Sequence, residues 1–111
     1  MLMNHIDITK NIKLIEGQKA ELLLNAAQLN MLLSNMDEGD IQDKLADFLS
    51  EIAASTYLLG RRLGLSYNSI EKKIDEKLRI KVLNEFVEKV EANDIYELID
   101  YRKRSSERKQ G

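Results

Sequence analysis

The stretch from Asp40 to Leu65 carries the clearest periodic pattern in the chain. Its apolar residues recur at steps of three and four, which is the spacing of a helix with one broad buried face. These residues are Ile41, Leu45, Phe48, Leu49, Ile52, Ala53, Leu59 and Leu63. The pattern therefore predicts a long amphipathic helix.

Both ends of this helix carry sequence signals. Asp40 with Asp43 predicts an N-cap followed by an acidic first turn. Gly64 is the residue type that ends helices in a left-handed conformation, and Arg61 and Arg62 suit the negative end of the helix dipole. We expect the helix to stop at Gly64.

A second apolar pattern precedes this helix. It predicts a helix that begins near Asp7 or Thr9, runs to Met36 and is weakened at Gly17 by about 1 kcal/mol relative to alanine. The polar Asp37–Gly39 separates the two helices, so they are predicted to form an antiparallel hairpin. The apolar residues of the first helix are Ile12, Ile15, Leu22, Leu23, Ala26, Leu29, Leu32, Leu33 and Met36.

The rest of the chain predicts shorter helices. Ser66 is the expected N-cap of a helix over 66–80 with a narrow apolar stripe of Ile70, Ile74 and Leu78. Further helical turns are predicted from Lys81 to Val90, ended by Asn93–Asp94.

Asp94 with Glu97 matches an acidic capping box that opens a last helix. The basic run that starts at Arg102 is interpreted as a solvated terminus rather than a phosphate contact. Residues 1–104 are expected to form one helical domain, with 105–111 a polar, frayed tail.

Composition supports an all-α fold and excludes several functions. The 111 residues include no proline and only 5% aromatics, which leaves few breakers and few β-formers. With 17 basic and 19 acidic residues the net charge is −2, which argues against nucleic acid as a partner. The absence of cysteine and a single histidine, His5, argue against a zinc enzyme.

No apolar run approaches the roughly 20 residues that span a bilayer, and the N-terminus lacks the order of a signal peptide. We therefore expect a cytoplasmic protein without a membrane partner.

Asp43, Asp47 and Glu51 lie four residues apart in the long helix and form a ladder beside its apolar stripe. Such a ladder either meets solvent or holds a cation. One helix cannot surround an ion, so a Mg²⁺ site needs oxygen ligands from a second element.

The preceding helix offers Glu21, Asn25 and Gln28 on one side. Two of these are amides, which can coordinate through an oxygen but bring no charge, and this weakens any Mg²⁺ site.

The segment DIQDKLADFLSEIAASTYLLGRRLGLS, followed by IEKKIDEKL, resembles the second and third helices of the MazG-like all-α nucleoside triphosphate pyrophosphohydrolases. In that family the first helix carries an E-x-x-E motif, and the second carries E-x-x-D within a run similar to ELADVL. The resemblance covers residues 12–80 and is most specific from KLADFL to RLGLS.

Transferred position by position, the aspartate of E-x-x-D is Asp47, and its glutamate falls at Lys44. The E-x-x-E pair falls at Asn25 and Gln28. Three of the four ligand positions thus lack a carboxylate.

The resemblance implies Mg²⁺-dependent hydrolysis of a nucleoside triphosphate to a monophosphate and pyrophosphate. With a degraded site we expect weak or absent Mg²⁺ binding and a protein that is weakly active or silent, acting in nucleotide binding or protein interaction. Alternatively, Glu21, Asp43 and Glu51 supply displaced ligands and activity is retained. Lys44 could also bind a phosphate directly.

A second alternative is a DNA-binding helix-turn-helix around Gly60 and Gly64, with Ser66 opening a recognition helix that carries Lys72 and Lys73. The preceding helix, from Ile41 to Leu63, would span about 35 Å, which is too long for that motif.

The hairpin has more apolar surface than one chain can hide, and symmetric pairing commonly covers such a surface. We expect a homodimer that forms a four-helix-type bundle, in keeping with the dimers or tetramers that the resemblance implies. The residues concerned are Leu22, Leu23, Leu24, Met31, Leu32 and Leu33.

Overall fold

The structure is a computed structural model that describes residues 5–35 and 41–110, and the side chains of 9–35 and 41–108. These residues form four helices and no strand, which confirms the all-α class. The helices are α1 (His5–Ser34), α2 (Gln42–Arg62), α3 (Tyr67–Leu83) and α4 (Lys89–Gln110). The chain divides into two compact units, residues 1–67 and 68–111.

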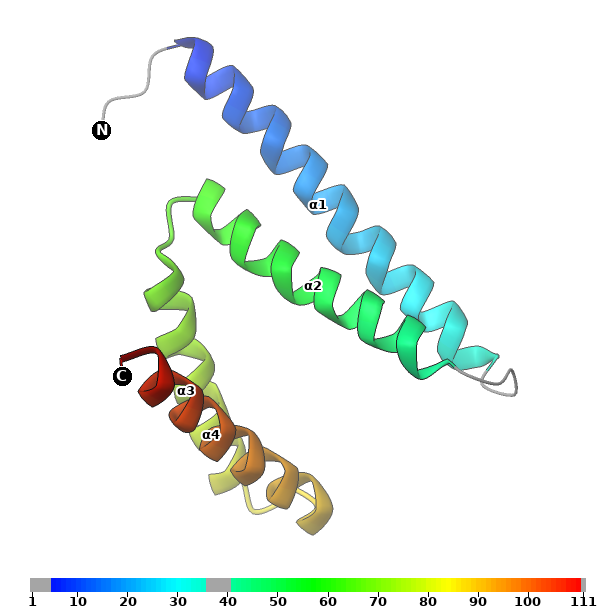
Figure 1. Cartoon of the computed structure of the whole chain (residues 1–111), viewed down its shortest axis with the longest axis vertical. Coiled ribbons are helices and arrows are strands. Elements are labelled where there is room, and N and C mark those ends of the chain that lie inside the picture. The colour runs from blue at the N-terminus through cyan, green and yellow to red at the C-terminus, as the bar shows by residue number, and fades with distance from the viewer. Residues whose placement is uncertain (1–4, 36–40, 111) are drawn as a thin grey trace. The chain divides into compact units, whose positions relative to one another are not determined.

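The first unit contains α1 and α2, which pack against each other as the predicted antiparallel hairpin (Figure 1). Each helix turns one stripe of less exposed residues toward the other, and we call the two stripes together the seam. The seam residues are Asn11, Ile15, Gln18, Leu22, Asn25, Leu29 and Leu32 of α1, together with Ile41, which directly precedes α2, and Leu45, Phe48, Ile52, Ser55, Leu59 and Arg62 of α2. Their spacing alternates between three and four, as in a coiled coil.

One hydrogen bond shows the register of α1 relative to α2, that is, which residues of the two helices lie opposite one another. The Asn11 amide nitrogen donates to the backbone oxygen of Arg62 at 3.1 Å. Each helical residue advances about 1.5 Å along its helix axis. A residue of α1 and a residue of α2 that are the same number of positions from this bond therefore lie at the same height along the hairpin, and we call such residues level. Asn25 is therefore level with Phe48, and Gln28 with Leu45.

The C-terminal end of α2 was predicted correctly. Gly64 has a φ of 94°, and its N–H donates to the oxygen of Arg61 at 3.2 Å. The N–H of Leu65 donates to the oxygen of Gly60 at 2.9 Å. These two bonds form a Schellman motif, which leaves glycine as the favoured residue at the left-handed position.

The predicted start of α2 was wrong in its cap. Ile41 occupies the N-cap position and offers no side-chain hydrogen bond, while Asp40 and the predicted turn Asp37–Gly39 lie outside the described residues. Asp43 does provide an acidic first turn. The start of α1 was also wrong, because helical backbone already includes His5, upstream of both predicted caps.

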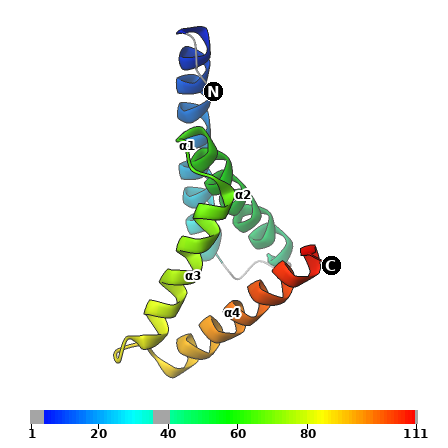
Figure 2. The ribbon, with the colours of Figure 1, turned by 90° about the vertical axis from the view of Figure 1, so that its left-hand side faces the viewer.

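The second unit contains α3 and α4, which diverge from the turn that joins them (Figure 2). Ser66 directly precedes α3, and the predicted stripe of α3 is its less exposed face, with Leu78 buried. On α4 the corresponding buried residue is Ile95.

Two predictions in this unit were wrong. The break lies at Asn84–Glu88, where the Asn84 side-chain oxygen accepts a hydrogen bond from the N–H of Phe86 at 2.9 Å. Asn93–Asp94 lies inside α4, and α4 continues through the expected tail to Gln110.

Within the described ranges, no helix combines the length and the apolar character needed to cross a membrane.

Candidate functional site

Most of the predicted site residues lie along one edge of the α1–α2 seam. Each of them directly precedes a seam residue in the sequence. In two antiparallel right-handed helices, the residues that precede the facing positions lie on the same side of the pair. The predicted site residues on this side are Glu21, Gln28, Lys44, Asp47 and Glu51, and we call these five the charged edge. The same side also carries Lys10 and Arg61 and the exposed apolar residues Leu14, Leu24, Met31 and Leu58.

Asn25 differs from the rest because it belongs to the seam itself and is half-buried. Its amide nitrogen donates to the backbone oxygen of Glu21 at 2.9 Å, so one of its hydrogen-bonding groups is engaged by its own helix.

Asp43 lies apart from the other predicted ligands. It stands two residues before Leu45, which places it further round α2 on an exposed surface that faces away from α1. The acid ladder therefore spirals from the outer surface at Asp43 to the charged edge at Asp47 and Glu51.

The charged edge is exposed along its length. Its five residues are all solvent-exposed, and in the described part of the chain none of their side chains forms a hydrogen bond or ion pair with another of the set. The exposed Ser50 next to Asp47 donates its hydroxyl to the Asp47 backbone oxygen at 2.9 Å, which leaves the Asp47 carboxylate unengaged by that neighbour.

The residues at the ligand positions do not fit a Mg²⁺ ion. Together they supply one carboxylate, from Asp47, two neutral amides and the ammonium group of Lys44, whereas Mg²⁺ is held by carboxylates and other hard oxygen ligands. Among the described side chains, no group of three histidines or acids is arranged to hold a metal ion.

The members of the alternative ligand set lie at different places on the hairpin. Glu21 and Glu51 lie on the same edge and at nearly the same level, because Glu21 is level with Ile52. Asp47 follows one turn away on α2. Asp43 is the member of the alternative set that faces elsewhere.

The model of the MazG-like family matches residues 8–95. The chain belongs to the MazG-like family. The matched part of this MazG-like protein includes α2 and α3 entirely and ends within α4. Comparisons with curated proteins and with solved structures gave no significant match.

The length of α2 argues against the helix-turn-helix alternative. The would-be first helix, α2, has 21 residues, so the length objection stands.

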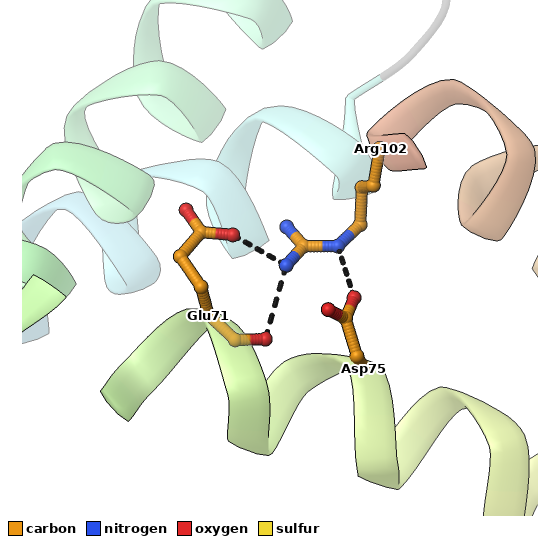
Figure 3. Close-up of polar contacts among 3 residues, drawn as sticks. All are labelled: Glu71, Asp75 and Arg102. Carbon is orange, nitrogen blue, oxygen red and sulfur yellow. Dashed lines mark hydrogen bonds and ion pairs between the residues drawn. The ribbon is translucent and has the colours of Figure 1, made fainter. Parts of the chain in front are cut away.

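The sequence interpretation missed the role of Arg102, which joins the two helices of the second unit (Figure 3). Its Nε donates to Asp75 Oδ1 at 2.9 Å, and one terminal nitrogen donates to the backbone oxygen of Glu71 at 3.1 Å and to the Glu71 carboxylate. The Arg102 side chain is only 18% exposed, so it is not part of a solvated basic terminus.

A signal for this role was present in the sequence. Ile95, Ile99 and Arg102 are separated by four and three residues and are less exposed than most of α4. Arg102 therefore continues the inward stripe of its helix, where an arginine needs acidic partners.

Proposed function

We propose that this MazG-like protein acts through protein interaction, as a homodimeric helical module that does not hydrolyse nucleoside triphosphates by the mechanism of its family. The observation that carries the proposal is the chemistry at the ligand positions. Lys44 places an ammonium group beside Asp47, and Asn25 and Gln28 contribute no charge. A bound divalent cation would meet one attractive charge and one repulsive charge there.

Exposed apolar side chains support the interaction part of the proposal. Leucines and a methionine on α1 remain about half-exposed or more, and two leucines of α2 do as well. Large apolar side chains that are left this exposed are candidates for burial against a partner. The residues are Leu14, Leu23, Leu24, Met31, Leu33, Leu49 and Leu58.

The first experiment measures pyrophosphate release from a panel of nucleoside triphosphates with Mg²⁺ or Mn²⁺. We expect no turnover above the protein-free control and no difference between the wild type and Asp47→Asn. Metal-dependent release that Asp47→Asn abolishes would overturn the proposal and favour the active alternative; loss of that release in Glu21→Gln, Asp43→Asn or Glu51→Gln would then identify the displaced ligands.

A second candidate function is metal-independent nucleotide binding at the charged edge. Lys44 is exposed and forms no ion pair with an acid among the described residues. It directly precedes Leu45, which is level with Gln28 of α1. A lysine ammonium can hold a phosphate as a point charge.

Thermal shift separates these functions, because a ligand that binds the folded state raises the melting temperature. Stabilisation by a nucleoside triphosphate without metal, lost in Lys44→Gln, would favour nucleotide binding. We expect no response to nucleotide either with or without Mg²⁺, a result that would favour the protein-interaction function.

A further inference from the structure

The charged residues of α3 are separated onto different faces of the helix. Its basic residues outnumber its acidic ones by five to three. Two of the acids, Glu71 and Asp75, turn toward α4, where both bind Arg102 (Figure 3). By helical spacing, the basic residues lie on the rest of the helix surface. We call this surface the basic face; it consists of Lys72, Lys73, Lys77, Arg79 and Lys81, which are all exposed.

The third acid of α3 offsets only part of this charge. Glu76 lies on the basic face and forms an ion pair with Lys73 at 3.5 Å, in which both side chains are mostly exposed. The other four cations form no ion pair with a described residue. The basic face is therefore positively charged, although the net charge of the whole chain is −2.

Two large apolar side chains lie among these cations. Ile80 is 67% exposed and Leu83 is 82% exposed. By helical spacing both lie near the middle of the basic face, with cations on either side of them. Leu78, on the opposite stripe of α3, is buried. The outer surface of α3 thus combines positive charge with apolar groups that the second unit leaves uncovered.

This combination distinguishes between possible partners. Nucleic acid phosphates would attract the cations but would leave Ile80 and Leu83 without a role. A second copy of the chain, paired by a two-fold axis, would bring two positive faces together. The surface of an anionic membrane fits both features, because its headgroups attract lysine and arginine while apolar side chains enter the layer beneath. Long lysine side chains can keep their ammonium groups at the headgroups during such contact.

We infer that the basic face of α3 binds the surface of membranes that contain anionic lipids, with Ile80 and Leu83 entering the interfacial layer. The sequence predicted no membrane partner because it lacks a spanning segment, but binding at the surface needs none. The inference is independent of the proposed protein interaction, because the basic face lies in the second unit. Salt should weaken the binding, since dissolved ions screen the attraction between exposed charges.

Co-sedimentation of the full chain with vesicles tests the inference. We expect binding to vesicles of phosphatidylcholine mixed with phosphatidylserine, and none to phosphatidylcholine alone. Lys77→Gln combined with Lys81→Gln should weaken the binding about 30-fold, because two of the five cations are lost. Lys103→Gln combined with Arg108→Gln is the matched control. It changes the net charge equally but on α4, so it should bind nearly as the wild type does.

Ile80→Gln tests the apolar part of the contact. It keeps every charge and replaces an exposed side chain, so helix content measured by circular dichroism should not change. We expect vesicle binding to weaken several-fold, because the apolar group no longer enters the interfacial layer. Fluorescence anisotropy with labelled single-stranded and duplex DNA, at the same salt concentration, measures the competing phosphate chemistry. We expect DNA to bind more weakly than the anionic vesicles.

Several results would overturn the inference. One is the absence of binding to vesicles with phosphatidylserine, and another is an equal loss of binding in the two charge-changing pairs. Tighter binding to DNA that Ile80→Gln leaves unchanged would assign the basic face to nucleic acid instead. The dependence of wild-type binding on salt and on phosphatidylserine keeps the test decisive if a variant does not fold.

Discussion

Asn11 and Arg62, on different helices and 51 positions apart, exchange two hydrogen bonds across the seam of the hairpin. The Asn11 amide nitrogen donates to the Arg62 backbone oxygen at 3.1 Å, and the Arg62 guanidinium donates to the Asn11 side-chain oxygen at 3.5 Å. Polar pairs inside a helical seam favour the alignment that satisfies them over shifted ones. Arg62 thus fixes the register of the hairpin as well as suiting the end of the α2 dipole.

The next polar layer of the seam lies one heptad further along, where Gln18 is level with Ser55. Ser55 is 3% exposed, and the buried Gln18 Oε1 has no hydrogen-bond partner among the described residues. A buried acceptor without a partner costs about 1–3 kcal/mol. We predict that Gln18→Met raises the free energy of unfolding by about 1 kcal/mol, measured by urea denaturation at fixed protein concentration.

Gln28→Met is the matched control, because Gln28 is exposed and its replacement should change stability by less than about 0.5 kcal/mol. Equal effects of the two substitutions would contradict the assignment of a cost to the buried oxygen of Gln18.

Arg102→Ala should destabilise the second unit. The substitution removes the bonds that Arg102 makes to Glu71 and Asp75. Both acids are nearly half-exposed, so solvent screening reduces the loss to about 1–2 kcal/mol. Arg104→Ala is the control, since its pair with Asp100 at 3.3 Å is mostly exposed and is expected to contribute less than about 0.5 kcal/mol.

Urea unfolding followed by circular dichroism measures the free energy of unfolding of both variants. A double-mutant cycle with Asp75→Asn then isolates the coupling between Arg102 and Asp75. Additive effects in that cycle would show that the two side chains do not interact in solution.

Gly17 and Gly64 are expected to respond in opposite ways to substitution by alanine. Gly64 has a φ of 94°, and a Cβ built there meets nothing within 4 Å. Gly64→Ala should therefore lower stability through backbone strain alone, by about 1–2 kcal/mol. Gly17 lies inside α1 with open space around it, so Gly17→Ala should raise stability by about 0.5–1 kcal/mol.

Thermal denaturation of the two variants at one concentration provides the comparison. A rise in melting temperature for Gly64→Ala would mean that α2 does not end in the left-handed conformation in solution.

Local signals in the sequence predicted the parts of the fold that depend on local backbone chemistry. The end of α2 was predictable because its left-handed position requires glycine. The turn after α3 was not, because the apolar residues around Phe86 continue a helical pattern, while the Asn84 side chain competes for the backbone N–H. Asn93–Asp94 suggested a break, but their weak helix preference is overridden in α4, where the next residue, Ile95, is buried.

Part of the arrangement of the candidate residues also follows from the sequence. Spacing alone places Glu21, Gln28, Lys44 and Asp47 along one side of a hairpin, and the seam positions agree with that placement. The sequence alone did not show that Asp43 faces a different side of α2 from Asp47 and Glu51. Residues four apart are neighbours on the helix surface, but each four-residue step also turns the side chain further around the helix axis. Only the direction of the partner helix shows that Asp43 faces away.

Restoring the family carboxylates tests the view that their loss silences the protein. Asn25→Glu, Gln28→Glu and Lys44→Glu, combined in one variant, would surround Asp47 with the charges that Mg²⁺ prefers. Without metal the variant should melt at a lower temperature than the wild type, because like charges then gather at one level of the hairpin. Mg²⁺ should reverse this loss by binding the folded state.

We expect the wild type to show no change in melting temperature with Mg²⁺, and the triple variant to be stabilised in proportion to the logarithm of the Mg²⁺ concentration once binding is saturating. Adding Asp47→Asn to the triple variant should weaken that response, since it removes the one native carboxylate. If the triple variant ignores Mg²⁺ while remaining folded, then Asn25, Gln28, Lys44 and Asp47 do not converge in solution. In that case the silence of the site comes from its geometry rather than from its lost charges.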